Sequence, residues 1–268
     1  MEIERIDIKY AKINRMVTQK SDLCHTKILP WLSIVQSQEG VYGIQLGNRK
    51  AQTTEEGGFF IAPSGVQQTI THHLNSKTQQ MRCRWLFLDV VINKTYRPDF
   101  LYDFPTILPQ EQTEAMQKLF DRLFASDSIF ENYRCYYEIL EILFSLATPN
   151  NNGNHTAMQS TLEYIRKNFA SEIKVEDLAR AAHMSASNLF AVFKKQFGVS
   201  PITYVNQYRL SLANEYLLEH DIPITEIAAM VGFRDALYFS KMFRKMYQIS
   251  PKEYRKQHQA KEKKNHSD

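Results

Sequence analysis

Residues 175–201, VEDLARAAHMSASNLFAVFKKQFGVSP, and residues 224–251, ITEIAAMVGFRDALYFSKMFRKMYQISP, decide the fold of this chain. The two stretches coincide at an offset of about fifty residues, for example at Leu178 and Ile227 and at Phe193 and Phe243. Such repetition indicates one supersecondary unit used twice. In each copy a short apolar-periodic segment, a turn and a longer apolar-periodic segment predict a helix-turn-helix.

Cap and turn residues support this prediction. Ser185 and Asp235 stand where a side-chain oxygen caps the second helix of each copy. Gly232 occupies the turn of the second copy, where a left-handed backbone costs glycine nothing, and His183 occupies the same place in the first copy. Gly198 stands at the C-cap of the first long helix. The last turns of the long helices carry cations that favour the helix dipole and can meet phosphate, namely Lys194, Lys195, Arg244 and Lys245.

Residues 204–255, with the run GF-x-D-x-x-YFS-x-x-F from Gly232 to Phe243, resemble the AraC/XylS family of transcription regulators. The resemblance covers residues 156 to about 257 and implies seven helices, with a linker helix over about 201–220 between the two units. It implies a sequence-specific regulator that binds double-stranded DNA, with RNA polymerase as a further partner. The DNA-contacting residues that we expect are Ser185, Ser187, Asn188, Phe190, Ala191, Lys194, Lys195, Arg209, Ala236, Leu237, Ser240, Lys241, Arg244 and Lys245.

Length and charge agree with two domains. The chain has 268 residues and a formal net charge of +4, and a chain of this size can bury two cores. Residues 1–153 hold 16 Lys and Arg against 17 Asp and Glu, a net charge of −1, which leaves 17 against 12, a net of +5, for residues 154–268. The basic half contains the repeated motif, as expected of a DNA-binding domain. Residues 148–155, TPNNNGNH, predict a flexible linker between the halves.

The N-terminal half predicts short strands up to about residue 93. The segments WLSIVQSQ, VYGIQLG, GFFIAP, VQQTITHHL and RCRWLFLDVVI are rich in β-branched and aromatic residues, with turn residues between them. Their spacing predicts a barrel or sandwich, and the arrangement is similar to the cupin-like effector domains of AraC-type proteins. The expected fold class is therefore α+β: a cupin-like β-barrel domain over 1–108 with a helical segment over 109–147, and an all-α domain with two helix-turn-helix units over 156–257. Residues 258–268 form a basic tail, expected to be frayed.

A metal-dependent cupin enzyme is the alternative for the N-terminal domain. Such a site needs a His-x-His pair, a Glu and a further His on facing strands. His25 stands alone, Gln67 and Gln68 occupy the place of the later His, and the adjacent His72 and His73 point to opposite faces of a strand. We therefore expect no metal, no cofactor and no enzyme activity.

The remaining expectation for this domain is a pocket for a small-molecule effector, for which a sugar is one candidate class. Strand alternation places Cys83, Trp85 and Phe87 on one face and Arg84 on the other. Trp85 is either a ligand contact or a core residue, and His25 is either structural or a ligand contact. The full set of candidate ligand residues is His25, Gln36, Gln68, Thr69, Arg84 and Trp85.

Two helices are expected over 110–125 and 130–147. Tyr133, Tyr136 or Tyr137, Leu140 and Leu143-Phe144 recur in the second at three- and four-residue spacing. One apolar stripe must cover the barrel. A second stripe either packs internally or pairs with another subunit, as in dimeric members of the family, so a homodimer is expected.

Three unpaired, widely spaced cysteines, the absence of a long apolar run and the charged start of the chain predict a cytoplasmic protein. The hypothesis is a ligand-responsive activator of metabolic genes, carbohydrate-utilisation genes among them. The alternatives are an anti-activator that binds other proteins and a sensor that does not bind DNA.

Overall fold

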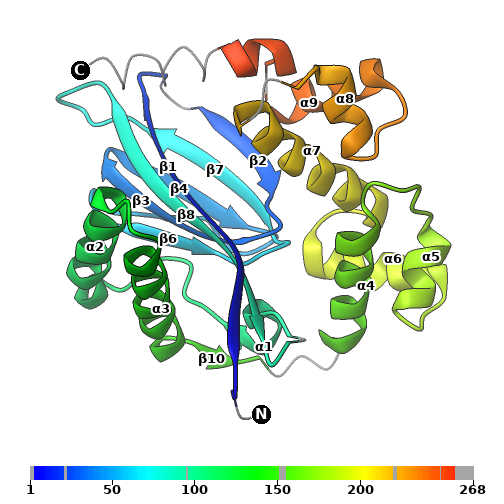
Figure 1. Ribbon diagram of the computed structural model, residues 1–268, viewed down its shortest axis with the longest axis horizontal. Helices are drawn as coiled ribbons and strands as arrows, with labels where there is room; N and C mark the ends of the chain where they lie inside the picture. Colours follow the sequence, from blue (N-terminus) through cyan, green and yellow to red (C-terminus); the bar gives the residue numbers. More distant parts are fainter. Residues whose placement is uncertain are drawn as a thin grey trace. The chain divides into compact units, whose positions relative to one another are not determined.

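The computed structural model describes residues 3–20, 23–94, 96–150, 155–219, 222–247 and 249–256. By its internal contacts the chain divides into two compact units, one of Met1–Cys24 with Trp31–His155 and one of His25–Pro30 with Thr156–Asp268 (Figure 1). The predicted basic tail and residues 151–154 of the predicted linker lie outside the described residues.

Eight of the described strands form two four-stranded sheets that pack face to face, and all of their residues except 25–28 belong to the first unit. The first sheet has the order β1–β8–β3–β6, formed by Ile6–Thr18, Met81–Ile92, Leu32–Glu39 and Phe59–Ala62. The second has the order β2–β7–β4–β5, formed by Cys24–Ile28, Gln67–His73, Val41–Leu46 and Gln52–Thr53. The predicted strands are present as β3, β4, β6, β7 and β8, whereas β1, β2 and β5 were not predicted from the sequence. His25 lies on β2.

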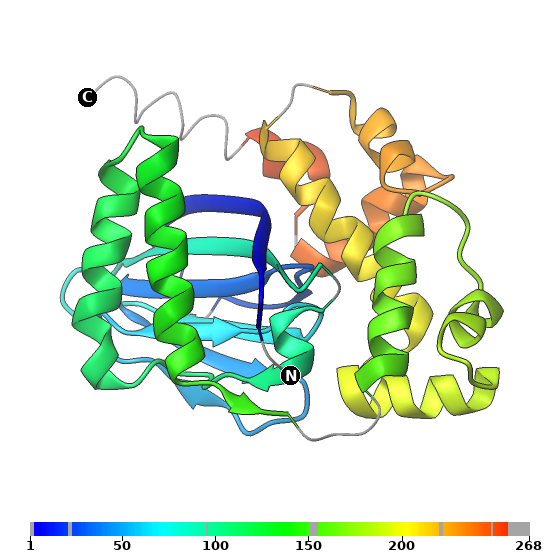
Figure 2. The ribbon, with the colours of Figure 1, turned by 60° about the horizontal axis from the view of Figure 1, so that its bottom comes forward.

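Strand β8 has two buried faces. Leu86 and Leu88 belong to a core with helices α2 (Gln110–Ala125) and α3 (Ile129–Ser145), which cover the outer face of the first sheet (Figure 2). Met81 and Cys83 belong to a second core between the two sheets. Alternation along one strand thus separates a helix-covered core from an inter-sheet core.

Three short elements flank the helical segment of this unit. Helix α1 (Pro98–Leu101) leads into β9 (Tyr102–Asp103), and β9 pairs with β10 (Thr148–Pro149). The first two residues of the predicted flexible linker are therefore part of a strand, because they find a pairing partner after α1.

The C-terminal unit is all helical. Its helices are α4 (His155–Asn168), α5 (Val175–Ala181), α6 (Ala186–Phe197), α7 (Pro201–Glu219), α8 (Ile224–Met230) and α9 (Ala236–Tyr247). Residues 251–256 are also helical, so the described residues account for the seven helices that the resemblance implies. Helices α5 and α6 form the first helix-turn-helix, α8 and α9 form the second, and α7 contacts both. No described helix is long and apolar enough to cross a membrane.

The caps and turns lie where the sequence places them. The Ser185 side chain accepts a hydrogen bond from Asn188 N at 3.3 Å, and Asp235 Oδ1 accepts from Leu237 N at 2.7 Å. His183 has φ 53° and Gly232 has φ 89°, so both turns use the left-handed region. The two positions differ in their surroundings. His183 is exposed, whereas a Cβ on Gly232 would lie 2.5 Å from the carbonyl oxygen of Phe169.

This difference predicts opposite effects of two substitutions. His183→Gly should raise the free energy of unfolding by about 1 kcal/mol, because it removes the left-handed strain of a residue with Cβ. Gly232→Ala should lower it by roughly 2–4 kcal/mol, because strain and a clash with backbone add. Urea unfolding of the full chain, followed by the helical signal, measures both.

Gly47→Ala is the control for strain alone, since Gly47 has φ +53° and a Cβ at this position would meet nothing within 4 Å. It should cost about 1 kcal/mol. Equal losses for Gly47→Ala and Gly232→Ala would contradict the packing argument.

Candidate nucleic-acid interface and ligand residues

The long helix of each helix-turn-helix unit is anchored by one apolar face. Leu189 and Phe193 of α6 are fully buried, and the Phe193 ring packs edge-on against Tyr204 of α7 at 5.3 Å between centroids. Phe239 and Phe243 of α9 are equally buried in the core formed with α7 and α8. Each unit therefore holds its long helix firmly and turns the opposite face to solvent.

The exposed faces carry the residues predicted to contact DNA. On α6 and its cap these are Ser185, Ser187, Asn188, Phe190, Ala191, Lys194 and Lys195, all exposed. On α9 Leu237, Lys241, Arg244 and Lys245 are exposed, while Ala236 and Ser240 are half-buried. Phe190 is 44% and Leu237 82% exposed. A large apolar side chain near the start of each long helix, followed by cations in its last turn, is suited to thymine methyl groups and phosphates.

Arg209 is the exception among these residues. Its side chain is buried, and Nε and Nη2 donate to the carbonyl oxygens of Phe169 at 2.8 Å and Ser171 at 2.7 Å. The prediction that Arg209 contacts DNA is therefore wrong for this structure, because the Arg209 guanidinium is hydrogen-bonded to backbone carbonyl oxygens at the end of α4.

Two of the predicted ligand residues hold α2 against the first sheet. Arg84 Nε donates to Gln36 Oε1 at 2.7 Å, and Gln36 Nε2 donates to Gly57 O at 2.9 Å. Arg84 Nη2 also pairs with Asp121 at 2.7 Å, and its guanidinium lies 5.5 Å from the ring centre of Phe120. These groups are occupied by the protein itself, which corrects the ligand role expected of Gln36 and Arg84.

The other four predicted ligand residues are not brought together as one set. Gln68 faces the inter-sheet core with Ile70, Trp85 packs at the edge of that core, and Thr69 points to the opposite face of β7. His25 groups with the second unit. Gln68 and Trp85 therefore remain as inward-facing candidates, and Thr69 and His25 do not join them.

Gln68 is unusual because its side chain is fully buried and neither its amide nitrogen nor its amide oxygen has a hydrogen-bond partner among the described residues. Ser33 Oγ, which lies on the inter-sheet face of β3, is in the same situation. Sequence reasoning missed Ser33. Its only signal was a serine between the apolar residues Leu32 and Ile34 of the strand.

A row of aromatic rings lies along the same unit. Tyr10 stacks on Trp31 at 5.0 Å between centroids, Trp31 on Phe87 at 5.8 Å, and Phe87 lies 6.2 Å from Trp85. Strand pairing places Ser33 opposite Phe87, so the row passes close to one of the unpaired polar groups. Sequence reasoning missed Tyr10 and Trp31.

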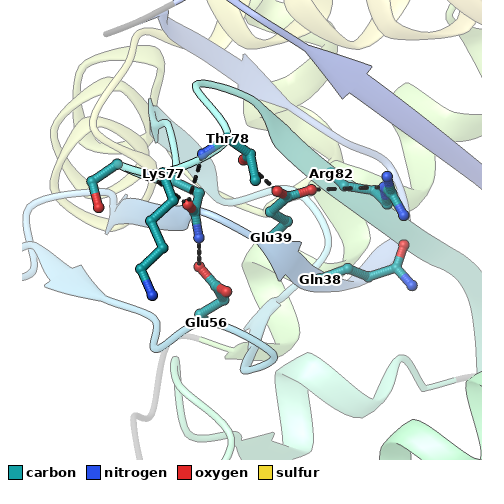
Figure 3. Close-up of a pocket in the computed structure, with 8 residues that line it drawn as sticks. Gln38, Glu39, Glu56, Lys77, Thr78 and Arg82 are labelled. Atoms are coloured by element: carbon teal, nitrogen blue, oxygen red, sulfur yellow. Dashed lines mark hydrogen bonds and ion pairs between the residues drawn. The ribbon is translucent and has the colours of Figure 1, made fainter.

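A separate open pocket of about 520 Å³ lies among the turns at the edge of the sheets (Figure 3). Glu39 accepts hydrogen bonds from Thr78 and, at 3.0 Å, from Gln80. Glu56 accepts from Asn75 at 2.7 Å. These bonds fasten the β7–β8 hairpin, and no predicted ligand residue lines the pocket. In the described part of the chain no group of three or more His, Cys, Asp and Glu side chains is placed to hold a metal ion.

A β-sandwich unit combined with a double helix-turn-helix unit defines a two-domain protein of the helix-turn-helix class. Residues 178–257 match the family model described as a helix-turn-helix domain. The lactose operon transcription activator of Staphylococcus xylosus is 37% identical over 98 residues, which cover 37% of this chain and 35% of that protein. The transcriptional activator RhaS of Klebsiella pneumoniae is 34% identical over 111 residues, which cover 41% and 40%. These matches support the resemblance of the C-terminal domain to the AraC/XylS family.

The chain spans less than half the length of these relatives. A solved structure extends the likeness to both units in fold alone. Apo ToxT from Vibrio cholerae superposes with a TM-score of 0.67 at 13% identity, covering 91% of this chain and 96% of that one. The cupin-like character predicted for the N-terminal domain agrees with this fold.

The two buried glutamines predict opposite stability effects. Gln68→Leu should raise the free energy of unfolding by about 1–3 kcal/mol, because it removes a buried amide that lacks partners. Gln36→Leu should lower it by about 1–3 kcal/mol, because it leaves the Arg84 guanidinium and Gly57 carbonyl short of a partner. Thermal unfolding of the two variants measures this, and a destabilised Gln68→Leu protein would show that the amide is satisfied in solution.

Proposed function

We propose that the protein is a sequence-specific transcription regulator that binds double-stranded DNA through α6 and α9 and responds to a small polar organic molecule held by its N-terminal unit. The regulated genes that fit this proposal are metabolic, with carbohydrate utilisation as one case, since the lactose operon activator shares its DNA-binding domain. The observation that carries the DNA-binding part is the pair of long helices, each buried on one face and exposed on a face of apolar and basic side chains.

The spacing of the two helix-turn-helix units supports recognition of one DNA site by a single chain. Helix α7 has 19 residues and spans roughly 28 Å at about 1.5 Å per residue. Successive major grooves on one face of DNA lie about 34 Å apart. One chain should therefore contact two adjacent major-groove segments and bind a directional, non-palindromic site of about twenty base pairs. Phe190, Ala191 and Leu237 favour readout by methyl contacts and DNA shape over bidentate hydrogen bonds.

The test begins with selection of a site from random DNA by the full chain. Affinity for that site should fall by roughly a thousandfold or more between about 50 and 200 mM salt, because the cations displace counterions from phosphates. Lys194→Gln and Arg244→Gln should each reduce the slope of log affinity against log salt by about 1. Phe190→Ala and Lys241→Ala should cost about 1–3 kcal/mol each and disturb opposite ends of the site.

Lys118→Gln is the matched control, because Lys118 is an exposed lysine on α2 that pairs with Glu114. It should leave both affinity and salt slope unchanged. Footprinting that shows protection of a single groove, or Phe190→Ala and Lys241→Ala acting on the same base pairs, would contradict the two-groove model. Failure to select any site would favour the alternative, an anti-activator that acts through protein contacts.

The sensing part of the proposal rests on the inter-sheet face. Gln68 and Ser33 offer buried hydrogen-bonding groups without partners among the described residues, and Trp31, Phe87 and Trp85 offer aromatic surface nearby. Few polar groups among apolar and aromatic ones are typical of small-molecule sites. Hydroxyl-rich molecules such as sugars combine an apolar ring face with polar edges, so they fit this set of groups.

A thermal-shift screen of mono- and disaccharides against the full chain tests the ligand class. Trp85→Ala should abolish or weaken both the thermal shift and the response of a reporter gene. DNA binding should persist, because the helix-turn-helix units lie in a separate domain. Gln68→Leu should also lose the response while gaining stability, which separates loss of the site from loss of folding. A folded Trp85→Ala protein with the wild-type response would assign Trp85 to the core.

The proposal extends to the oligomeric state, the cellular location and a further partner of the protein. Helix α3 presents an exposed apolar surface that fits pairing with a second copy, formed by Ile129, Phe130, Tyr133 and Tyr137, of which Phe130 is 82% exposed. We place the protein in the cytoplasm as a non-catalytic homodimer, with RNA polymerase as a further partner.

A further inference from the structure

Arg209 lies in the middle of α7, the helix that joins the two helix-turn-helix units. It is one of few buried charged side chains among the described residues of the C-terminal unit, with 9% exposure. Its two donors reach the carbonyl oxygens of Phe169 and Ser171, which follow the last residue of α4, Asn168. Carbonyl groups at a helix C-terminus lack intrahelical partners, and a cation there also complements the helix dipole. Arg209 therefore fixes the end of α4 to α7.

The same short segment, residues 169–172, also contacts the turn of the second helix-turn-helix. Gly232 approaches so closely that an added Cβ would lie 2.5 Å from Phe169 O. Arg234 pairs with Glu172 at 2.7 Å. The Arg209 guanidinium lies 5.8 Å from the ring centre of Phe233, in the range of a cation–π contact. Three elements, α4, α7 and the α8–α9 turn, thus meet at this segment.

The segment leads directly into the first helix-turn-helix, because α5 begins at Val175. The position of α5 and α6 relative to α8 and α9 consequently depends on how residues 169–172 are held. Packing of α7 against both helix-turn-helix units sets the approximate distance between them. Directed hydrogen bonds from a planar guanidinium to two carbonyls add orientation, which a lysine ammonium does not reproduce.

Burying the Arg209 charge costs free energy, which argues that the geometry of its hydrogen bonds has a role in the protein. Burial lowers the pKa of the Arg209 guanidinium, although an arginine side chain stays protonated in proteins. An apolar residue of similar length would avoid this penalty.

We infer that Arg209 is a positioning residue that sets the spacing and angle between the two recognition helices, and with them the separation of DNA segments that the protein accepts. The inference rests on the DNA binding proposed above. It assigns to a residue that does not touch DNA a role in choosing which sites are bound.

The experiment uses the full chain and the site selected from random DNA. A panel of duplexes carries insertions or deletions of one and two base pairs between the two protected segments, and further duplexes carry only one segment. Dissociation constants are measured for the wild type, Arg209→Met and Arg209→Lys. Arg166→Met is the matched control, because Arg166 lies on α4 and pairs within that helix with Glu163, at 2.9 Å.

The wild type and Arg166→Met should lose about tenfold or more in affinity for each change of spacing, as for a mismatch of about 1.4 kcal/mol. Arg209→Met should bind the original spacing about tenfold more weakly and vary by less than about threefold across the panel. Its affinity for single-segment duplexes should stay within about threefold of wild type. Arg209→Lys, which keeps the charge, should also lose the spacing preference.

Two results would overturn the inference. One is a wild-type spacing preference in Arg209→Lys and Arg209→Met. The other is an equal loss on single-segment and complete sites, which indicates a smaller folded fraction and no effect on geometry. If Arg209→Met fails to fold, the panel measured with Arg209→Lys decides between these results. Selection of no site by the wild type would count against the proposed DNA binding and is therefore distinguishable from a failure of this inference.

Discussion

The left-handed turn between the short and long helices is the constraint on which both helix-turn-helix units depend. It sets the angle at which the long helix leaves the core, so that Leu189 or Phe239 is buried while Phe190 or Leu237 faces outward. Only glycine adopts this backbone freely. The first copy tolerates His183 because the turn is exposed, whereas the second turn lies against the Phe169 carbonyl and has room for no side chain. Which residue fits at the turn therefore depends on the surrounding atoms as well as on the backbone dihedral angle.

Strand β8 has a comparable organising role in the N-terminal unit. Its two faces enter two different cores, one closed by α2 and α3 and one lying between the sheets. The helix-covered face is mostly apolar and contains the Arg84–Gln36 pair, which is hydrogen-bonded within the protein. The inter-sheet face carries aromatic rings and two polar side chains, Ser33 and Gln68, that have no hydrogen-bond partner among the described residues. A single alternating strand thus lets one side of the sheet pack against helices while the other side carries the groups for which we propose a ligand.

Sequence predicted the elements whose signals are local. The repeat, its caps and its turns lie where periodicity and cap chemistry place them, and five strands follow from their β-branched residues. Strand β1 was missed although Ile6, Ile8, Ala11 and Ile13 pack against one core, because the charged residues between them mask the apolar alternation. The true roles of Arg84 and Arg209 were missed for another reason. Their partners lie 48 and 40 residues away, and no local pattern reports such contacts.

The buried polar groups differ in a way that composition alone does not show. Gln36 and Gln68 are both buried glutamines on strands, yet the first makes hydrogen bonds with Arg84 and Gly57 and the second makes none with the described residues. A satisfied polar group offsets its desolvation by fixing neighbours in direction as well as distance, as Arg209 does at the end of α4. An unsatisfied one costs free energy and fixes nothing in the protein, so its retention needs a reason outside the fold. Recognition of a ligand that supplies the missing partners is such a reason, and it is the one that we propose for Gln68.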